Sequence, residues 1–220
     1  MGRVFALKNV RIYFKKMGRM KFVSHLDMTR VMSRLIKKSG IPIWYTEGFN
    51  RHIYMNFALP LSLGYEGTNE VMDIRIIDDE YPLDKVLASL QAVCPPDIEI
   101  IKATNPVKPT KEIGFADYVL AFDEINCDLK SLFADFFSKE SVTVEKKGKK
   151  GKIKEVDIMP KIKACCVEDN TLTLQLVAGS EDNLNPALVM DAFFEIFGLE
   201  PVFYTVTRTS ILDKQGNPFI

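Results

Sequence analysis

The chain has 220 residues, of which 47% are hydrophobic and 26% charged, as in an ordinary globular protein. Its apolar runs are far shorter than the roughly 18 residues of a membrane-spanning helix, and its charged beginning is a poor signal peptide, so we expect a cytoplasmic protein without membrane contact. The net charge is zero, but residues 1–64 hold 12 Lys and Arg against only Asp27 and Glu47, a net charge of +10, which leaves −10 for residues 65–220.

The first part of the chain predicts one β-α-β-β-α-β unit. Residues 8–15 alternate apolar and polar side chains as a half-buried strand does, and the chain then turns at Gly18 and continues in strand over 20–23. Residues 25–39 carry apolar side chains at helical spacing, and Gly40 ends this helix. The other expected elements of the unit are strands at 52–57, 71–77 and 97–103 and a helix at 83–93.

A proline-containing linker at 105–115 separates this unit, residues 1–104, from a second at 116–220. The second unit repeats the alternation of strand and helix and adds a basic hairpin at 145–154. We therefore expect an α+β fold of two ferredoxin-like β-α-β-β-α-β units with antiparallel sheets. In the second unit the expected elements are strands at 117–122, 141–147, 152–158, 161–167, 171–177 and 201–212 and helices at 129–139 and 186–197.

The stretch SHLD lies where a strand gives way to the helix at 25–39. Ser24 and Asp27 have the spacing of an acidic capping box, in which the serine oxygen accepts a first-turn N–H and the acid meets the positive end of the helix. Capping does not explain His25. That residue could face solvent, cover the edge of the core or line a site.

The stretch GFNRH is the second feature. Gly48 and Asn50 suit a tight turn with positive φ, and Phe49 would anchor that turn in the core. The other interpretation rests on the neighbours, because aromatic rings interleaved with Arg51 and His52 are typical of single-stranded RNA recognition. The nearby aromatic residues are Trp44, Tyr45 and Tyr54.

Two groups of cations could hold phosphates. The helix at 25–39 has a basic exposed face, formed by Arg30, Arg34, Lys37 and Lys38. The hairpin at 145–154 has a glycine-lysine turn, with Lys147, Lys149 and Lys150 as its candidate contacts. The alternative is that both groups are only solvated, or that the basic first part attracts the acidic second part.

Signals for catalysis or cofactors are few. His25 and His52 could act as acid and base in metal-independent RNA cleavage if both reached one phosphate. The four cysteines form no CxxC pair, so we expect reduced thiols, no metal site and no cofactor.

The segments GRMKFVSHLDMTRV, YTEGFNRH and FALPLSLGYEG resemble the radical SAM-linked protein family, a bacterial domain of unknown function. The matching motif positions include Ser24, His25, Asp27, Gly48, Phe49, Asn50 and His52. Arg51 and Ile53 stand where the family pattern usually has prolines, so this loop should be less rigid. The double unit is also similar to the RNA-binding superfamily of CRISPR repeat-processing proteins.

This resemblance implies a radical SAM protein as partner, in an RNA or ribosome context, and brings no established activity. A radical SAM enzyme holds its cluster with a CxxxCxxC run, which the sequence lacks. We therefore expect a non-catalytic RNA-binding or substrate-presenting partner of such an enzyme, in which Arg51, His52 and Tyr54 contact bases or sugars. The alternatives are the ribonuclease that uses His25 and His52, and a module that binds only protein.

Overall fold

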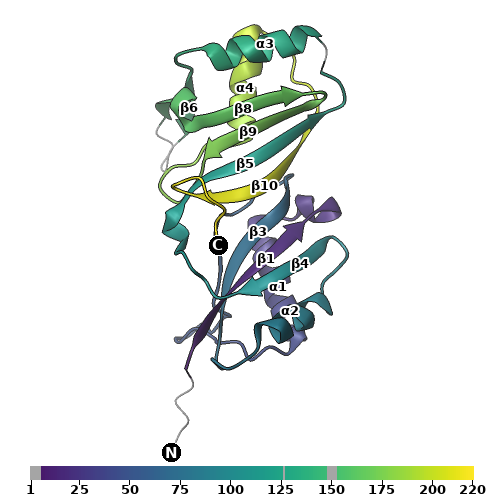
Figure 1. Ribbon diagram of the computed structural model, residues 1–220, viewed down its shortest axis with the longest axis vertical. Coiled ribbons are helices and arrows are strands. Elements are labelled where there is room, and N and C mark those ends of the chain that lie inside the picture. Colours follow the sequence, from purple (N-terminus) through teal and green to yellow (C-terminus); the bar gives the residue numbers. More distant parts are fainter. Residues whose placement is uncertain (1–5, 126, 148–152) are drawn as a thin grey trace, which may run out of the picture. The chain divides into compact units, whose positions relative to one another are not determined.

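The computed structural model describes residues 6–125, 127–147 and 153–220, and Figure 1 shows its elements. The chain forms two compact units, one ending at Glu112 but including Phe219 and Ile220, the other running from Ile113 to Pro218. Both are mixed α+β units in which the described strands pair antiparallel. Among the described residues, no helix is long and apolar enough to cross a membrane.

The first unit has a four-stranded sheet with two helices. Its sheet order is β4-β1-β3, with β2 paired to the other side of β3. In chain order the elements are β1 (Lys8–Lys16), α1 (His25–Ser39), β2 (Met55–Phe57), β3 (Glu66–Ile76), α2 (Leu83–Gln91) and β4 (Ile98–Thr104).

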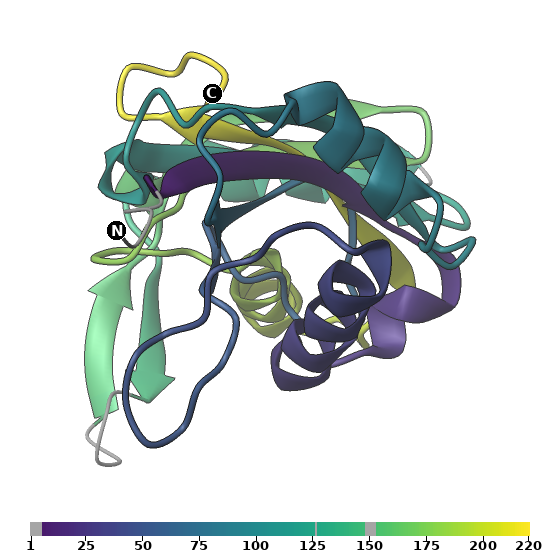
Figure 2. The ribbon, with the colours of Figure 1, turned by 90° about the horizontal axis from the view of Figure 1, so that it is seen from below.

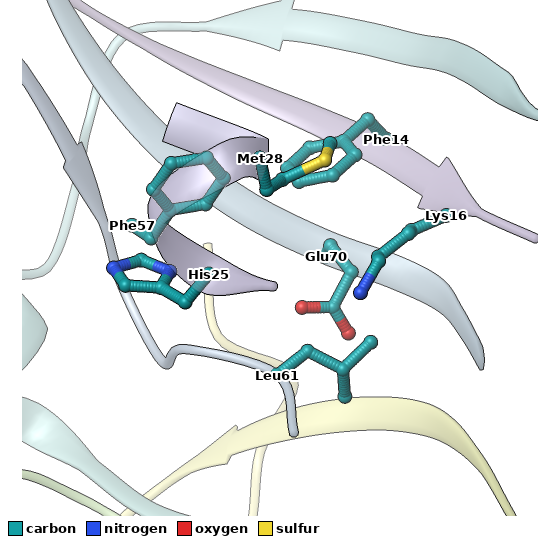
Figure 3. A pocket seen from close by; sticks show the side chains of 7 residues that line it. All are labelled: Phe14, Lys16, His25, Met28, Phe57, Leu61 and Glu70. Atoms are coloured by element: carbon teal, nitrogen blue, oxygen red, sulfur yellow. The ribbon is translucent and has the colours of Figure 1, made fainter. Parts of the chain in front are cut away.

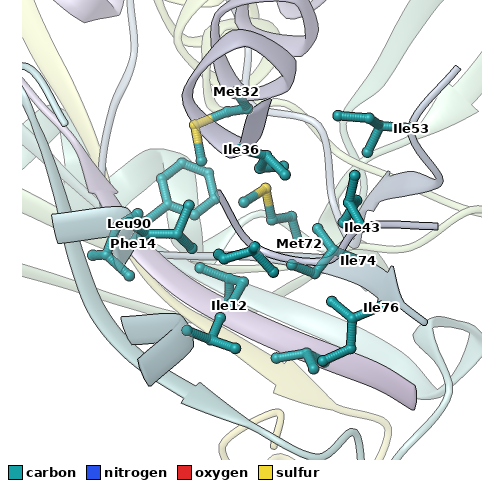
Figure 4. Close-up of a cluster of buried hydrophobic side chains, with 14 of the residues drawn as sticks. Ile12, Phe14, Met32, Ile36, Ile43, Ile53, Met72, Ile74, Ile76 and Leu90 are labelled. Carbon is teal, nitrogen blue, oxygen red and sulfur yellow. The ribbon is translucent and has the colours of Figure 1, made fainter. Parts of the chain in front are cut away.

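One face of this sheet is the core of the unit. Alternation along β1 and β3 directs Ile12, Met72 and Ile74 to the same side, where both helices pack on them (Figure 4). From α1 the helical spacing contributes Met32 and Ile36, which are fully buried. Truncating one such side chain to alanine typically costs about 2–5 kcal/mol, so this face fixes the register of β1 and β3.

Helix α1 begins and ends where the sequence predicts. Ser24 is its N-cap, and Gly40 adopts a left-handed φ of 72°, which ends the helix at Ser39. The expected strand at 20–23 is wrong, because residues 18–22 form a 3₁₀ turn. Gly18 takes a φ of 55° and its N–H donates to the Glu66 carboxylate, so the chain leaves the sheet at this point.

The second unit has a sheet of order β10-β5-β9-β8, and β6 pairs with β7 in a separate two-stranded sheet. In Figure 2 these two strands, in light green, stand apart from the sheet of their unit. Residues 113–115, expected in the linker, are already strand. The elements are β5 (Ile113–Phe122), α3 (Cys127–Ser138), β6 (Thr143–Lys147), β7 (Ile153–Asp157), β8 (Ile162–Glu168), β9 (Thr171–Val177), α4 (Pro186–Phe197) and β10 (Tyr204–Asp213).

Aromatic packing joins α3 to α4 in this unit. The rings of Phe133 and Phe193 stack with centroids 4.4 Å apart, and Phe136 meets Phe193 edge-on at 5.5 Å. Asn185 caps α4 by accepting the Ala187 N–H, as its Asn-Pro sequence predicts. The second unit therefore has its own apolar core.

Candidate nucleic-acid interface

The segment between α1 and β2 runs along the edge of β3. Ile43 bridges to Ile76, and the Trp44 N–H donates to the Arg75 carbonyl oxygen over 2.8 Å. The expected strand at 52–57 is shortened to β2, but a bridge still joins Tyr45 to Ile53.

An aromatic cluster forms where this segment meets β3, and we define it as Trp44, Tyr54 and Arg75. The Arg75 guanidinium lies 4.3 Å from the centre of the Tyr54 ring and 5.1 Å from that of Trp44. The two rings are 6.0 Å apart and tilted by 58°, and all three side chains are partly exposed. Arg75 is also held by the side-chain oxygen of Asn9, which accepts from its Nε over 2.9 Å. The result is a fixed surface of two rings and a planar cation, on which nucleobases can stack.

Sequence reasoning selected Tyr54 but missed Arg75. The signal was present, because Arg75 occupies the outward phase of a strand whose inward residues are apolar. Its register opposite Asn9 and its distance from the rings depend on tertiary pairing, which no local pattern reports.

The loop at 46–52 is not held by the buried aromatic side chain that the sequence predicts. Phe49 is fully exposed, so the expectation that it anchors the turn in the core is wrong. Polar contacts close the loop instead: the Thr46 N–H donates to the His52 carbonyl, and His52 Nδ1 lies 3.1 Å from Thr46 Oγ1 and 3.0 Å from the Asn50 carbonyl oxygen. Gly48 has a φ of 121°, whereas Asn50 does not take the positive φ we expected. Figure 2 shows this dark-blue segment as a long loop.

The four cations of α1, which we call the basic face, are all exposed. Arg30 differs from the other three because an acid offsets its charge: its Nη1 lies 2.8 Å from the Asp27 carboxylate. The other three are Arg34, Lys37 and Lys38. The Lys37 Nζ lies 5.9 Å from the centre of the Tyr45 ring, so the basic face reaches the segment that carries the aromatic cluster.

The SHLD stretch works as a cap, with one added contact. The Asp27 N–H donates to Ser24 Oγ over 3.2 Å, and Ser24 Oγ donates to an oxygen of Asp27 over 2.8 Å. These contacts lower the pKa of the exposed Asp27 carboxyl, first through the Ser24 hydroxyl and then through Arg30. Ser24 and Asp27 are thereby explained by local structure.

His25 lines a small cavity, shown in Figure 3. Its exposed ring meets Phe57 edge-on at 5.2 Å, and the buried side chains of Lys16 and Glu70 point toward each other nearby. Lys16 Nζ also donates to the Val23 carbonyl over 3.1 Å. The cavity volume is about 10 Å³, which is enough for one water and far too small for a nucleotide.

The two histidines have different surroundings. His52 is not among the residues that line the cavity beside His25, and its described contacts are within its own loop. Of the hairpin lysines, Lys147 ends the backbone of β6, whereas Lys149 and Lys150 lie outside the described residues. Arg51 is exposed beside His52.

The second unit has a larger hollow, of about 450 Å³, against α3 and β8. Phe133, Phe137, Cys165 and Cys166 are among its lining residues. Burial raises the pKa of Cys165 above its ordinary value, which keeps this thiol protonated at neutral pH. In the part of the chain that the structure describes, no three His, Cys, Asp or Glu side chains gather as a metal site would require.

Comparison with known proteins gives a family. The family model described as "Uncharacterized protein conserved in bacteria (DUF2344)" matches residues 9–186. The chain belongs to this family. Its members are an uncharacterised conserved bacterial group, which agrees with the domain of unknown function that the motifs resemble. None of the curated proteins matches the chain.

Two solved structures match the chain with low sequence identity and low TM-scores. One chain, from a "Crystal Structure of a Cbf5-Nop10-Gar1 Complex", has a TM-score of 0.44 and 8% identity, over 92% of this DUF2344 chain and 48% of its own length. A "putative glycine cleavage system transcriptional repressor" has a TM-score of 0.26 and 13% identity, over 94% of this chain and 99% of its own length. This protein thus spans about half the length of the first of them.

Proposed function

We propose that this DUF2344 protein binds single-stranded RNA through its first unit, as the non-catalytic partner of a radical SAM enzyme that modifies RNA or a ribosomal component. The observation that supports RNA binding most is the aromatic cluster. Trp44 and Tyr54 offer ring faces to bases, and the Arg75 guanidinium contacts both rings and so helps to hold them in place. Stacking of this kind tolerates any base sequence, because every base has a π-face.

The basic face supplies the phosphate contacts in this proposal. Lys37 lies against Tyr45, the residue next to Trp44, so a strand that stacks on the aromatic cluster can continue onto α1. Arg34 and Lys38 extend the positive surface along the helix. The fully exposed Phe49 and its neighbour Arg51 add a further ring and cation at the tip of the loop.

The radical SAM partnership rests on sequence. The motifs around SHLD and GFNRH resemble the radical SAM-linked family, and the absence of a CxxxCxxC run means that the cluster chemistry must belong to another chain or domain. A pull-down tests this half of the proposal. Immobilised DUF2344 protein should retain a radical SAM protein, and mutation of the loop at 46–52 should abolish that retention.

We also propose that both units follow the ferredoxin-like plan. The support is their matching order: the sheet of the first unit reads β4-β1-β3-β2 and that of the second β10-β5-β9-β8, with the helices at corresponding places in the chain. In this view the β6–β7 hairpin is an insertion between the first helix of the second unit and its next sheet strand.

The test of RNA binding compares two aromatic residues. Trp44→Ala should weaken the binding of a short mixed-sequence single-stranded RNA by about 5- to 150-fold, the equivalent of about 1–3 kcal/mol for one stacked base. Phe203→Ala is the matched control, because Phe203 is 72% exposed and lies in the second unit. Equal affinity of the two folded variants contradicts the assignment of the aromatic cluster. If the wild type binds no RNA at low salt yet retains a radical SAM protein, the basic part faces a protein instead.

A further inference from the structure

Phe219 and Ile220 belong to the first unit, although the whole of the second unit, Ile113 to Pro218, separates them from its other residues in sequence. The Tyr13 hydroxyl donates to the Phe219 carbonyl over 3.2 Å, and the Lys108 N–H donates to the Ile220 carbonyl over 3.2 Å. Phe219 is 2% exposed. These two residues, which we call the Phe219 segment, therefore lie on β1, on the side of Tyr13 and away from the core.

Beneath this segment lies Arg11. It faces Asp73 across the β1–β3 pair, and its Nε and Nη2 donate to the two carboxylate oxygens over 2.8 and 2.9 Å. The guanidinium is completely buried, and Nη1 has no hydrogen-bond partner among the described residues. A buried donor without a partner typically costs about 1–3 kcal/mol, so this arrangement calls for an explanation.

The Phe219 ring lies on this guanidinium, with its centre 4.4 Å from Arg11 Cζ. Beside it, the exposed Lys102 has its Nζ 4.1 Å from the centre of the Tyr13 ring. A planar cation with an aromatic ring on it, a phenol beside it and an exposed ammonium over that phenol together resemble the surroundings that proteins offer to an unpaired nucleobase.

We infer that Arg11, Tyr13 and Lys102 form a second nucleobase subsite, which Phe219 occupies in this structure and from which a base of bound RNA displaces it. This inference rests on the proposed RNA-binding function and deepens it. The base would stack on the guanidinium in place of the phenyl ring. The Nη1 hydrogen points within the guanidinium plane, so its acceptor would be a sugar hydroxyl of the same nucleotide, placed at the edge of that plane. The unpaired donor of Arg11 thus gains a partner only in the bound state.

The charges around Arg11 decide which part of the RNA fits. Asp73 neutralises the guanidinium through two hydrogen bonds, so Arg11 offers a stacking plane and a donor with little net charge. A phosphate would meet the Asp73 carboxylate, whose side chain is 15% exposed. The subsite therefore suits a base, and Lys102 is placed to attract the adjoining phosphate.

The experiment removes the Phe219 ring from the subsite by mutation. Phe219→Ala frees the subsite, so binding no longer has to displace the ring, and we expect the affinity for a fluorescein-labelled short mixed-sequence single-stranded RNA to rise by about 3- to 10-fold. Because Arg11 is neutralised, the salt dependence should keep its slope. Tyr13→Phe keeps the ring but removes the bond to the Phe219 carbonyl, and should raise the affinity less.

The control is Phe203→Ala, an aromatic truncation in the second unit. A folded Phe219→Ala protein whose affinity is unchanged or lower overturns the inference, and so does a gain that the control shares. If Trp44→Ala still loses binding in that case, the proposed function survives and only the subsite fails. Failure of every protein, the wild type included, to bind this RNA refutes both.

Discussion

Removing the positive charge of α1 should weaken RNA binding in a way that depends on salt. Of the four cations of the basic face, Arg30 is paired, with its Nη1 2.8 Å from the Asp27 carboxylate, whereas the other three form no ion pair with a described acid. We therefore expect Arg34, Lys37 and Lys38 to make most of the phosphate contacts, and the informative variant replaces these three with Gln.

The size of the effect follows from counterion release. Each phosphate contact on a single strand contributes about 0.7 to the slope of log affinity against log salt, so three contacts contribute about 2. Between about 50 and 200 mM salt, a fourfold change, the wild-type affinity should fall by roughly twentyfold more than that of the triple variant. At the lower salt the triple variant binds more weakly, and the difference narrows as salt is added.

Fluorescence anisotropy with a short single-stranded RNA at these two salt concentrations measures both slopes. The matched control replaces three exposed lysines elsewhere, Lys85, Lys111 and Lys130, with Gln and thus removes the same charge. An unchanged slope in the α1 variant, or the same loss of slope in the control, refutes the assignment of phosphate contacts to the basic face.

Three further outcomes are expected. Ser24→Ala removes the cap of α1 and should lower the free energy of unfolding, measured in urea, by about 1 kcal/mol. Because folding lowers the pKa of Asp27, the contribution of this carboxylate to stability is present at neutral pH and is lost as the pH falls below about 4. The difference in unfolding free energy between the variant and the wild type should therefore shrink at low pH, and a difference that stays constant would contradict the account. Gly114→Ala places a Cβ 2.6 Å from the Cα atom of Lys214 and should destabilise the protein by about 1–3 kcal/mol. An unchanged unfolding midpoint would contradict this, because it would mean that the backbone of β5 shifts to accept the methyl group without loss of stability. RNA incubated with the protein should stay intact by gel electrophoresis, and cleavage that disappears in His52→Ala would establish the ribonuclease instead.

Much of the secondary structure could be predicted from local patterns. The helix over 25–39 was predictable because its apolar spacing, its serine cap and its terminal glycine all agree. The failure at 20–23 has a tertiary cause: Gly18 bonds to Glu66, which is far away in sequence, and the chain turns out of the sheet. Strand patterns are short, so one distant hydrogen bond is enough to redirect them.

The site was only partly predictable. Tyr54 could be selected from the density of aromatic residues, but the contact of Arg75 with it arises from strand pairing. Phe49 was expected inside, because a large apolar residue in a turn usually is; hydrogen bonds of Thr46 and His52 close the loop and leave the ring outside. The contact between Phe219 and Arg11 joins residues more than two hundred positions apart in sequence, and no local pattern predicts it.

The central claim is that bases stack on the aromatic cluster, and Trp44 reports on it directly because it is the single tryptophan of the chain. The most direct measurement titrates the protein with unlabelled single-stranded RNA and follows tryptophan fluorescence alongside the anisotropy of labelled RNA. We predict that the fluorescence is quenched with the same midpoint as binding. Saturable binding by anisotropy with unchanged tryptophan fluorescence would contradict the claim and place the RNA on another surface.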